Sequence, residues 1–156
     1  MTPRPFLCGL VVVHENVFSG PCEMIRADEV DEHGHMEPID IGAHSNIQDG
    51  VVIHSRSNAA VTIGECTSIA HRAIVHGPCT MGDDVLIGFN NALFTCPVAK
   101  GCGVRQNVAV DGARTPEPYL PLARSFMTSD VWLNPAGGCV RRVERCLFAY
   151  ALPCSI

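Results

Sequence analysis

The sequence has little charge and no concentration of positive charge. Charged residues make up 17% of the chain, the net charge is −5, and the only adjacent basic residues are Arg141 and Arg142. Neutralising the phosphates of a nucleic acid requires clustered Lys and Arg side chains. We therefore predict that the protein does not bind nucleic acid.

The sequence also lacks a long apolar run. No segment approaches the roughly 20 apolar residues that are needed to cross a bilayer. The apolar stretch behind Arg4 is short for a secretion signal, and the following residues already fit the repeat described below. These features predict a cytoplasmic protein that does not enter a membrane.

Cysteine is frequent, but the spacing typical of zinc knuckles is absent. The chain has nine cysteines, an odd number, and no Cys-x-x-Cys pair. A zinc knuckle therefore has no support, and a framework of disulfides has little. Because a free cysteine behaves as a small buried hydrophobe, we interpret these residues as structural thiols in a reducing compartment.

What the sequence does have is a repeat with a period of six residues. Apolar residues make up 47% of the 156 residues, which is enough for one domain with a core. Aliphatic residues recur in this period at Ile41, Ile47, Ile53, Ile63, Ile69, Val75, Met81, Ile87 and Leu93, and after a slip at Val98, Val104 and Val110. Small or branched residues return four positions later at Ser45, Val51, Thr67, Ala73, Cys79, Val85, Cys102 and Val108.

This pattern predicts an all-β fold, a parallel β-helix built from hexapeptide repeats. Each hexad forms a short strand and a corner, and three hexads form one triangular coil of about 18 residues. The aliphatic residues point inward and stack on those of the neighbouring coils, because a single coil cannot bury its own inner face. A β-sandwich would instead show a period of two along each strand.

The repeat is interrupted twice and then ends. Ten residues separate Ile53 from Ile63, which predicts a projecting loop near residues 56–60. Residues 27–38 contain Gly34 and Pro38 and predict a second projecting loop. Because the repeat stops after Gly112, we divide the chain into a β-helix domain, residues 1–112, and a C-terminal extension, residues 113–156, that is irregular with a short capping helix around residues 141–150.

Three of the seven histidines hold positions that the repeat relates to one another. His54 and His76 each follow an inward-facing aliphatic residue and are one coil plus one loop apart, so they should stack at one corner. His71 lies on a different corner and can reach them only from an adjacent subunit of a threefold assembly. Since a catalytic zinc has three protein ligands, these positions predict a metal site between subunits. The remaining histidines are interpreted as surface or hydrogen-bonding residues: His14, His33, His35 and His44.

Three segments resemble the γ-class carbonic anhydrases. They are IRADE at residues 25–29, IGAHSNIQDGVVIH at residues 41–54 and SIAHRAIVHGPCTMGDDVLIGF at residues 68–89. The resemblance covers about residues 13–112, with a weaker echo at YLPLARSFMTS, and it is nearest to the branch that contains the archaeal enzyme and the N-terminal domain of the carboxysome scaffold protein.

The resemblance implies a left-handed coil, a homotrimer and a Zn²⁺, Fe²⁺ or Co²⁺ ion. It also implies a lyase activity, the reversible hydration of carbon dioxide to bicarbonate by a metal-bound hydroxide. By position, His54, His71 and His76 match the metal ligands of the family. Arg26 and Asp28 match an interface pair that helps to position the site, although these residues could equally form an ordinary salt bridge between subunits.

The resemblance also extends to residues around the metal ligands. Gln48 and Asp49 match residues that surround the ligands, with Gln48 near the metal-bound solvent, although Asp49 could equally be only a turn former. Asn46 matches a residue that shapes the pocket. Glu29 matches a glutamate that takes part in proton transfer or substrate placement.

The chain departs from the family pattern after His54. The archaeal enzyme has a longer acidic loop there that supplies a proton-shuttle glutamate, whereas this chain has SRSNAA without an acidic residue. Glu32 or Glu37 in the other loop is the available substitute. Two other functions stay open on the sequence: an assembly or scaffold protein with little or no catalysis, and a hexapeptide-repeat acyltransferase.

Overall fold

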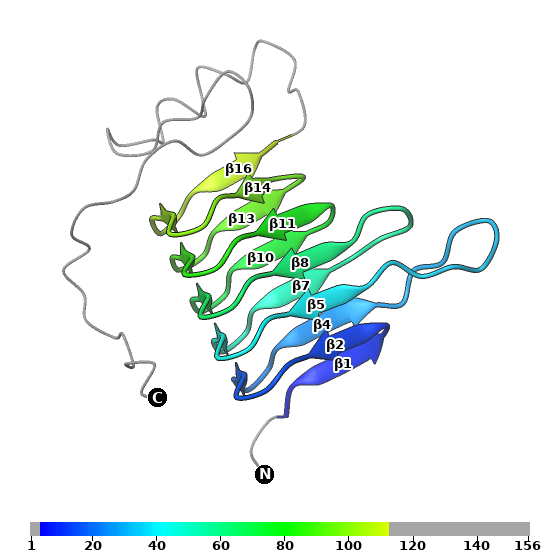
Figure 1. Ribbon diagram of the computed structural model, residues 1–156, viewed down its shortest axis with the longest axis horizontal. Coiled ribbons are helices and arrows are strands. Elements are labelled where there is room, and N and C mark those ends of the chain that lie inside the picture. Colours follow the sequence, from blue (N-terminus) through cyan, green and yellow to red (C-terminus); the bar gives the residue numbers. More distant parts are fainter. Residues whose placement is uncertain (1–3, 113–156) are drawn as a thin grey trace.

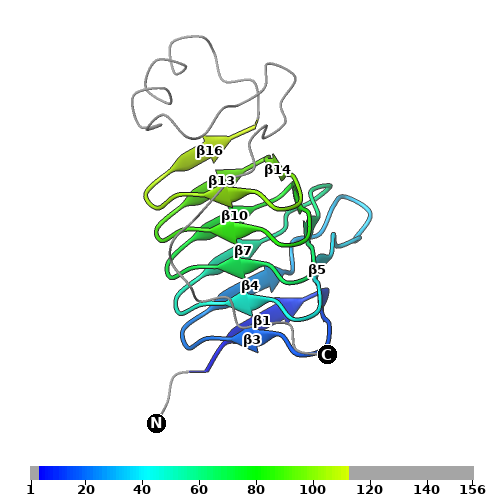
Figure 2. The ribbon, with the colours of Figure 1, turned by 60° about the vertical axis from the view of Figure 1, so that its left-hand side comes forward.

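The computed structural model describes residues 4–112, which form a parallel β-helix (Figures 1 and 2). Short strands follow one another around a triangular prism, and every strand pairs in parallel with the strand one coil away. The predicted fold class, a left-handed parallel β-helix of hexapeptide repeats, is confirmed. The predicted C-terminal extension and its capping helix lie outside the described residues.

Three parallel sheets form the sides of the prism. Sheet A contains β1 (Phe6–Gly9), β4 (Met24–Ala27), β7 (Val52–His54), β10 (Ile74–His76), β13 (Ala92–Phe94) and β16 (Ala109–Asp111). Sheet B contains β2 (Val11–Val13), β5 (Ile39–Ile41), β8 (Val61–Ile63), β11 (Cys79–Met81) and β14 (Pro97–Val98). Sheet C contains β3 (Phe18–Ser19), β6 (Asn46–Ile47), β9 (Ser68–Ile69), β12 (Leu86–Ile87) and β15 (Gly103–Val104).

The aliphatic residues of the repeat form the core. In sheet A, Ile53 pairs with Val75 and Val75 with Leu93, and all three side chains are fully buried. Burying a side chain of this size contributes about 1.5–3 kcal/mol. The residue four positions after each aliphatic is buried as well, as Val51 and Ala73 show. The hexad pattern therefore specifies the interior of the prism coil by coil.

Close approach of neighbouring coils explains the glycines at the corner between sheets B and C. A Cβ atom added to Gly64 would lie 2.4 Å from the backbone of Gly82, and one added to Gly82 would lie 2.6 Å from the backbone nitrogen of Lys100. Two positions further on, the backbone is left-handed in residues other than glycine, including Cys66 (φ 53°) and Asp84 (φ 57°). The repeat predicted the small residues but gave no sign of these left-handed positions.

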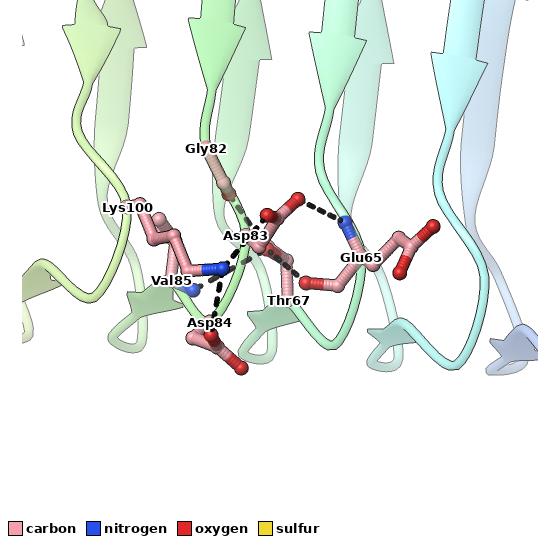
Figure 3. A network of polar contacts seen from close by, with 7 residues as sticks. All are labelled: Glu65, Thr67, Gly82, Asp83, Asp84, Val85 and Lys100. Carbon is pink, nitrogen blue, oxygen red and sulfur yellow. Dashed lines mark hydrogen bonds and ion pairs between the residues drawn. The ribbon is translucent and has the colours of Figure 1, made fainter.

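Side chains at the same corner connect three successive coils (Figure 3). Asp83 accepts hydrogen bonds from the backbone N–H of Glu65 at 3.1 Å and from Lys100 Nζ at 3.0 Å. Thr67 donates its hydroxyl to the carbonyl of Gly82 at 3.2 Å and accepts the N–H of Val85 at 3.3 Å. These bonds hold the coils in register where no strand does.

Two loops project from the corner between sheets A and B (Figure 1). The longer loop joins β4 to β5 and is closed by a bridge between Val30 and Met36. The shorter loop joins β7 to β8 and is closed by a bridge between Arg56 and Ala59. Both loops lie where the interruptions of the repeat predicted them.

No disulfide joins the six cysteines within residues 4–112 to one another. Cys79 is buried, and its thiol donates to the carbonyl of Cys96 at 3.0 Å. Burial raises the pKa of the Cys79 thiol to about 12, so it stays protonated and behaves as a core residue. In the described part of the chain, no helix is long and apolar enough to cross a membrane. The cytoplasmic location stays a prediction.

Candidate metal site

The corner between sheets A and B brings two histidines together at the ends of β7 and β10. The strand register pairs His54 with His76. Their ring centroids are 5.1 Å apart and their planes lie at 87°. The side chain of His54 is only 19% exposed. The stacking that the repeat predicted is therefore present within one chain, and we call this region the paired corner.

Each histidine of the paired corner has a ring nitrogen that makes no hydrogen bond within residues 4–112. His76 Nδ1 lies 3.1 Å from the carbonyl oxygen of Gly77. The tautomer that donates this bond keeps its proton on Nδ1 and a lone pair on Nε2. His54 Nε2 is buried and has no hydrogen-bond partner. Glu29 Oε1 lies 3.2 Å from it but does not complete a hydrogen bond. A buried polar atom without a partner is uncommon in a native protein.

An ion pair adjoins the paired corner. The register places Arg26 beside His54 on the neighbouring strand. Its guanidinium donates two hydrogen bonds to Asp28, at 3.0 Å from Nε and 2.9 Å from Nη2. These bonds hold the pKa of Asp28 below its ordinary value and raise the pKa of Arg26. The two planar groups therefore fix each other in a fork geometry.

His71 lies at a second corner, between sheets C and A. It lies in the turn that precedes β10, whereas His76 is the last residue of that strand. The ring of His71 is stacked on Phe89, with centroids 5.6 Å apart and planes at 5°. Asp49 Oδ2 lies 3.8 Å from His71 Nδ1, which is too long for a hydrogen bond. We call this region the His71 corner.

The other predicted site residues are divided between the two corners. Asn46 ends up on β6 next to the His71 corner, and its side-chain oxygen is buried without a hydrogen-bond partner. Gln48 follows β6 and lies at the His71 corner with Asp49. Within residues 4–112, no hydrogen bond or ion pair joins any of these residues to His54 or His76. Arg26, Asp28 and Glu29 lie at the paired corner instead.

The two groups of residues do not meet within one chain. Among residues 4–112, no group of three or more His, Cys, Asp or Glu side chains is placed to hold a metal ion. Two imidazoles are adjacent, and the third lies at the opposite end of a strand. A three-ligand site can be built from these residues only if a second copy supplies one of the corners.

Two aromatic residues beside the histidines were missed by the sequence interpretation. Phe94 follows His76 in the register of sheet A, and the two ring centroids are 5.3 Å apart. Phe89 lies flat against the ring of His71 at the other corner. The signal was available in the sequence, because each phenylalanine holds the same place in its hexad as the histidine one coil earlier.

Comparisons with known proteins agree with the fold and the resemblance, although no protein-family model matches the chain. The chain is 32% identical over 139 residues to a carbonic anhydrase of Methanosarcina thermophila, covering 76% of this chain and 54% of that protein. It is 34% identical over 131 residues to the carboxysome assembly protein CcmM of a Nostoc species, covering 76% of this chain and 22% of that protein.

A third relative has a different name. The carnitine operon protein CaiE of Escherichia coli K12 is 35% identical over 125 residues, covering 80% of this chain and 52% of that protein. The chain therefore spans about half the length, or less, of the curated relatives that it matches.

Proposed function

Because the chain is a homologue of γ-class carbonic anhydrase and of the carboxysome assembly protein, we propose that it forms a homotrimer that reversibly hydrates carbon dioxide. The metal sites lie between subunits. In each site, the paired corner of one subunit supplies His54 and His76, and the His71 corner of the next subunit supplies His71.

One observation carries this proposal. His54 and His76 are cross-strand neighbours whose rings are 5.1 Å apart, and His54 Nε2 is buried without a hydrogen-bond partner. A neutral imidazole nitrogen in this position can donate its lone pair to a metal ion. The bond from His76 Nδ1 to the carbonyl of Gly77 is also the support that ligand histidines have in proteins.

The donor set fits Zn²⁺, Fe²⁺ or Co²⁺, which all accept imidazole ligands. When bound by three neutral imidazoles, such an ion is a Lewis acid that makes a water molecule nucleophilic near neutral pH. The chain contributes the orientation of the ligands and a route for protons. Glu29 lies 3.2 Å from His54 Nε2 and is 45% exposed, so it can exchange a proton with solvent beside the site.

The remaining residues support the site from the two sides. Arg26 and Asp28 fix each other next to His54 and present their remaining polar edges to the neighbouring subunit. On the His71 corner, Gln48 orients the reacting solvent and Asn46 shapes the pocket. The carboxylate of Asp49 stands 3.8 Å from Nδ1 of His71.

An exposed apolar strip beside the histidines supports assembly of subunits. On the outer face of sheet A, the register aligns Phe6, Met24, Val52 and Ile74. Phe6 is 53% exposed, Met24 42% and Ile74 39%. A contiguous apolar strip of this kind is typical of a surface that another chain covers. The strip runs alongside the column that contains Arg26, His54 and His76, so the same contact completes the metal site.

A second candidate is an assembly protein that binds the metal but turns over little carbon dioxide. The identity of 34% to a carboxysome assembly protein favours it, as does the short loop after His54, which has no acidic residue. None of the three relatives is named as an acyltransferase, and that alternative stays an untested prediction.

Subunit mixing tests the shared site. His71→Ala and His76→Ala are each purified anaerobically and assayed for bound metal and for carbon dioxide hydration by stopped flow. Each variant alone should lose both. When the two are co-expressed in equal amounts, a site survives wherever an intact His76 meets an intact His71, so about a quarter of the sites should return.

The outcomes separate the candidates. His14→Ala, which removes an exposed histidine on sheet B, is the matched control and should keep full metal and activity. Failure of the mixed sample to recover any metal would show that the site is not shared. A wild-type protein that holds stoichiometric metal without hydrating carbon dioxide would favour the assembly protein. A wild-type protein without metal would end the enzyme proposal.

A further inference from the structure

The imidazole of His71 is held on one face by an aromatic ring. Its centroid lies 5.6 Å from that of Phe89, and the two planes are within 5° of parallel. Phe89 is 51% exposed, so its ring is not required by the core. Within residues 4–112 the His71 ring makes no hydrogen bond, and its side chain is 44% exposed. The stacking contact is therefore the main restraint on the ring in one chain.

The register of the β-helix produces this contact. His71 and Phe89 each stand two places after an inward-facing isoleucine of sheet C, Ile69 and Ile87. The N–H of Asn90 donates to the carbonyl of His71 at 3.1 Å, which joins two successive coils at this corner. Neighbouring strands are about 4.8 Å apart. The side chains in this slot must therefore lie one above the other.

We propose that Phe89 is a positioning residue for His71, and this inference rests on the proposed role of His71 as a metal ligand. The lone pair of an imidazole nitrogen lies in the plane of the ring, so fixing the plane fixes the direction of the metal bond. Face-to-face stacking does this and leaves both ring nitrogens free at the edge. A histidine whose ring rotates freely loses that freedom when it binds a metal ion held by another subunit, and the lost entropy weakens metal binding.

The histidines of the paired corner need less help. His76 is restrained by the carbonyl of Gly77 and by the edge of His54. Its own phenylalanine neighbour, Phe94, is tilted by 32° and does not lie flat on the ring. Phe89 therefore replaces, by stacking, the hydrogen bond that orients His76.

Cobalt binding to three variants tests the role of Phe89. Phe89→Ala removes the ring, and Phe89→Tyr keeps it. Val12→Ala is the control, because Val12 is a 40% exposed apolar residue on sheet B that pairs with Asp40 and belongs to neither corner. We expect Phe89→Ala to bind Co²⁺ about tenfold more weakly in a visible-absorption titration. Phe89→Tyr and Val12→Ala should keep the wild-type affinity.

A second readout uses the metal-free protein. The aromatic ring current of Phe89 shifts the ring-proton resonances of His71, so Phe89→Ala should move them and Phe89→Tyr should not. Unmoved resonances would overturn the stacking. Wild-type affinity for Co²⁺ in Phe89→Ala would overturn the positioning role, and loss of subunit assembly without a change at His71 would assign Phe89 to the interface instead. A wild-type protein that takes up no Co²⁺ would remove the proposed function itself, which is a different result.

Discussion

The paired corner and the His71 corner differ in how much of their geometry one chain supplies. At the paired corner, adjacent strands bring His54 against His76, a backbone carbonyl orients one ring, and the His54 side chain is 19% exposed. At the His71 corner, one histidine that is 44% exposed lies on a phenylalanine and has no second ligand beside it.

This difference has a consequence for assembly. Two adjacent imidazoles bind a divalent ion weakly, and a single imidazole binds it more weakly still, whereas catalytic zinc sites have three protein ligands. Under the proposed function, the paired corner is therefore an incomplete metal site with a fixed shape, and the His71 corner presents the missing ligand outward. In the proposed trimer, metal binding and subunit contact are coupled, because neither corner completes the coordination alone.

The largest effect is expected from a substitution that separates the two corners without touching either histidine. Ile74→Asp introduces a charge into the apolar strip of sheet A, where Ile74 is 39% exposed. Burying an unpaired charge at an interface is strongly unfavourable. We expect a folded monomer by circular dichroism that has lost its metal, as measured by sedimentation and metal analysis.

Thr80→Asp is the control for this substitution. Thr80 is also exposed and lies on β11 in sheet B, which follows β10 in the chain. This variant should remain a trimer with full metal. An Ile74→Asp protein that is monomeric but still holds one metal ion per chain would show that the paired corner is sufficient, and would remove the distinction between the corners.

A smaller effect is expected at the paired corner alone, from Glu29→Gln. The carboxylate lies 3.2 Å from His54 Nε2 and cannot carry a proton once it is an amide. We expect the hydration rate in dilute buffer to fall by about 100-fold, with unchanged metal content. Added imidazole buffer should restore much of the rate. Glu32→Gln, on the projecting loop at 87% exposure, is the control and should behave as wild type; an equal loss in both variants would point to the loop and not to Glu29.

The smallest effect is expected from Arg26→Ala, which removes the ion pair beside His54. The hydrogen bonds from Arg26 lower the pKa of Asp28, so their contribution to stability is complete above the ordinary pKa of an aspartate and is lost as the pH falls through the lower native pKa. Arg26→Ala should raise the pKa of Asp28 toward its ordinary value, as measured by carboxyl NMR. The stabilities of variant and wild type should converge in acid.

Lys100→Ala is the matched control for the pH experiment. Lys100 lowers the pKa of Asp83 through the same kind of hydrogen bond at a different corner. This variant should raise the pKa of Asp83 and leave that of Asp28 unchanged. A shift of Asp28 in both variants would mean that the change is not local to the ion pair.

Much of the fold could be predicted because the repeat is strict. Ile53, Val75 and Leu93 occupy one register, and they form one buried column. The ten-residue interval after Ile53 predicted the projecting loop. The left-handed backbone at Cys66 and Arg72 could not be predicted in this way, because neither residue type favours that conformation. The corner geometry imposes it.

The candidate site was predictable to a smaller extent. The spacing of His54 and His76 predicted their contact, because 22 residues correspond to one coil plus one loop. The contact of His76 with the carbonyl of Gly77 was not predictable, since it depends on a side-chain rotamer. The stacking of Phe89 on His71 follows from the register but has no chemical signature that would draw attention to it.

The sequence by itself determined the prism, because inward stacking depends only on which residue of each hexad is apolar. It also determined that two histidines share a corner. Only the tertiary structure showed that the buried His54 Nε2 has no hydrogen-bond partner within residues 4–112 and that the ring of His71 lies flat on Phe89. These features depend on the path of the backbone at each corner and on the rotamer of each ring. The spacing of residues along the sequence specifies neither.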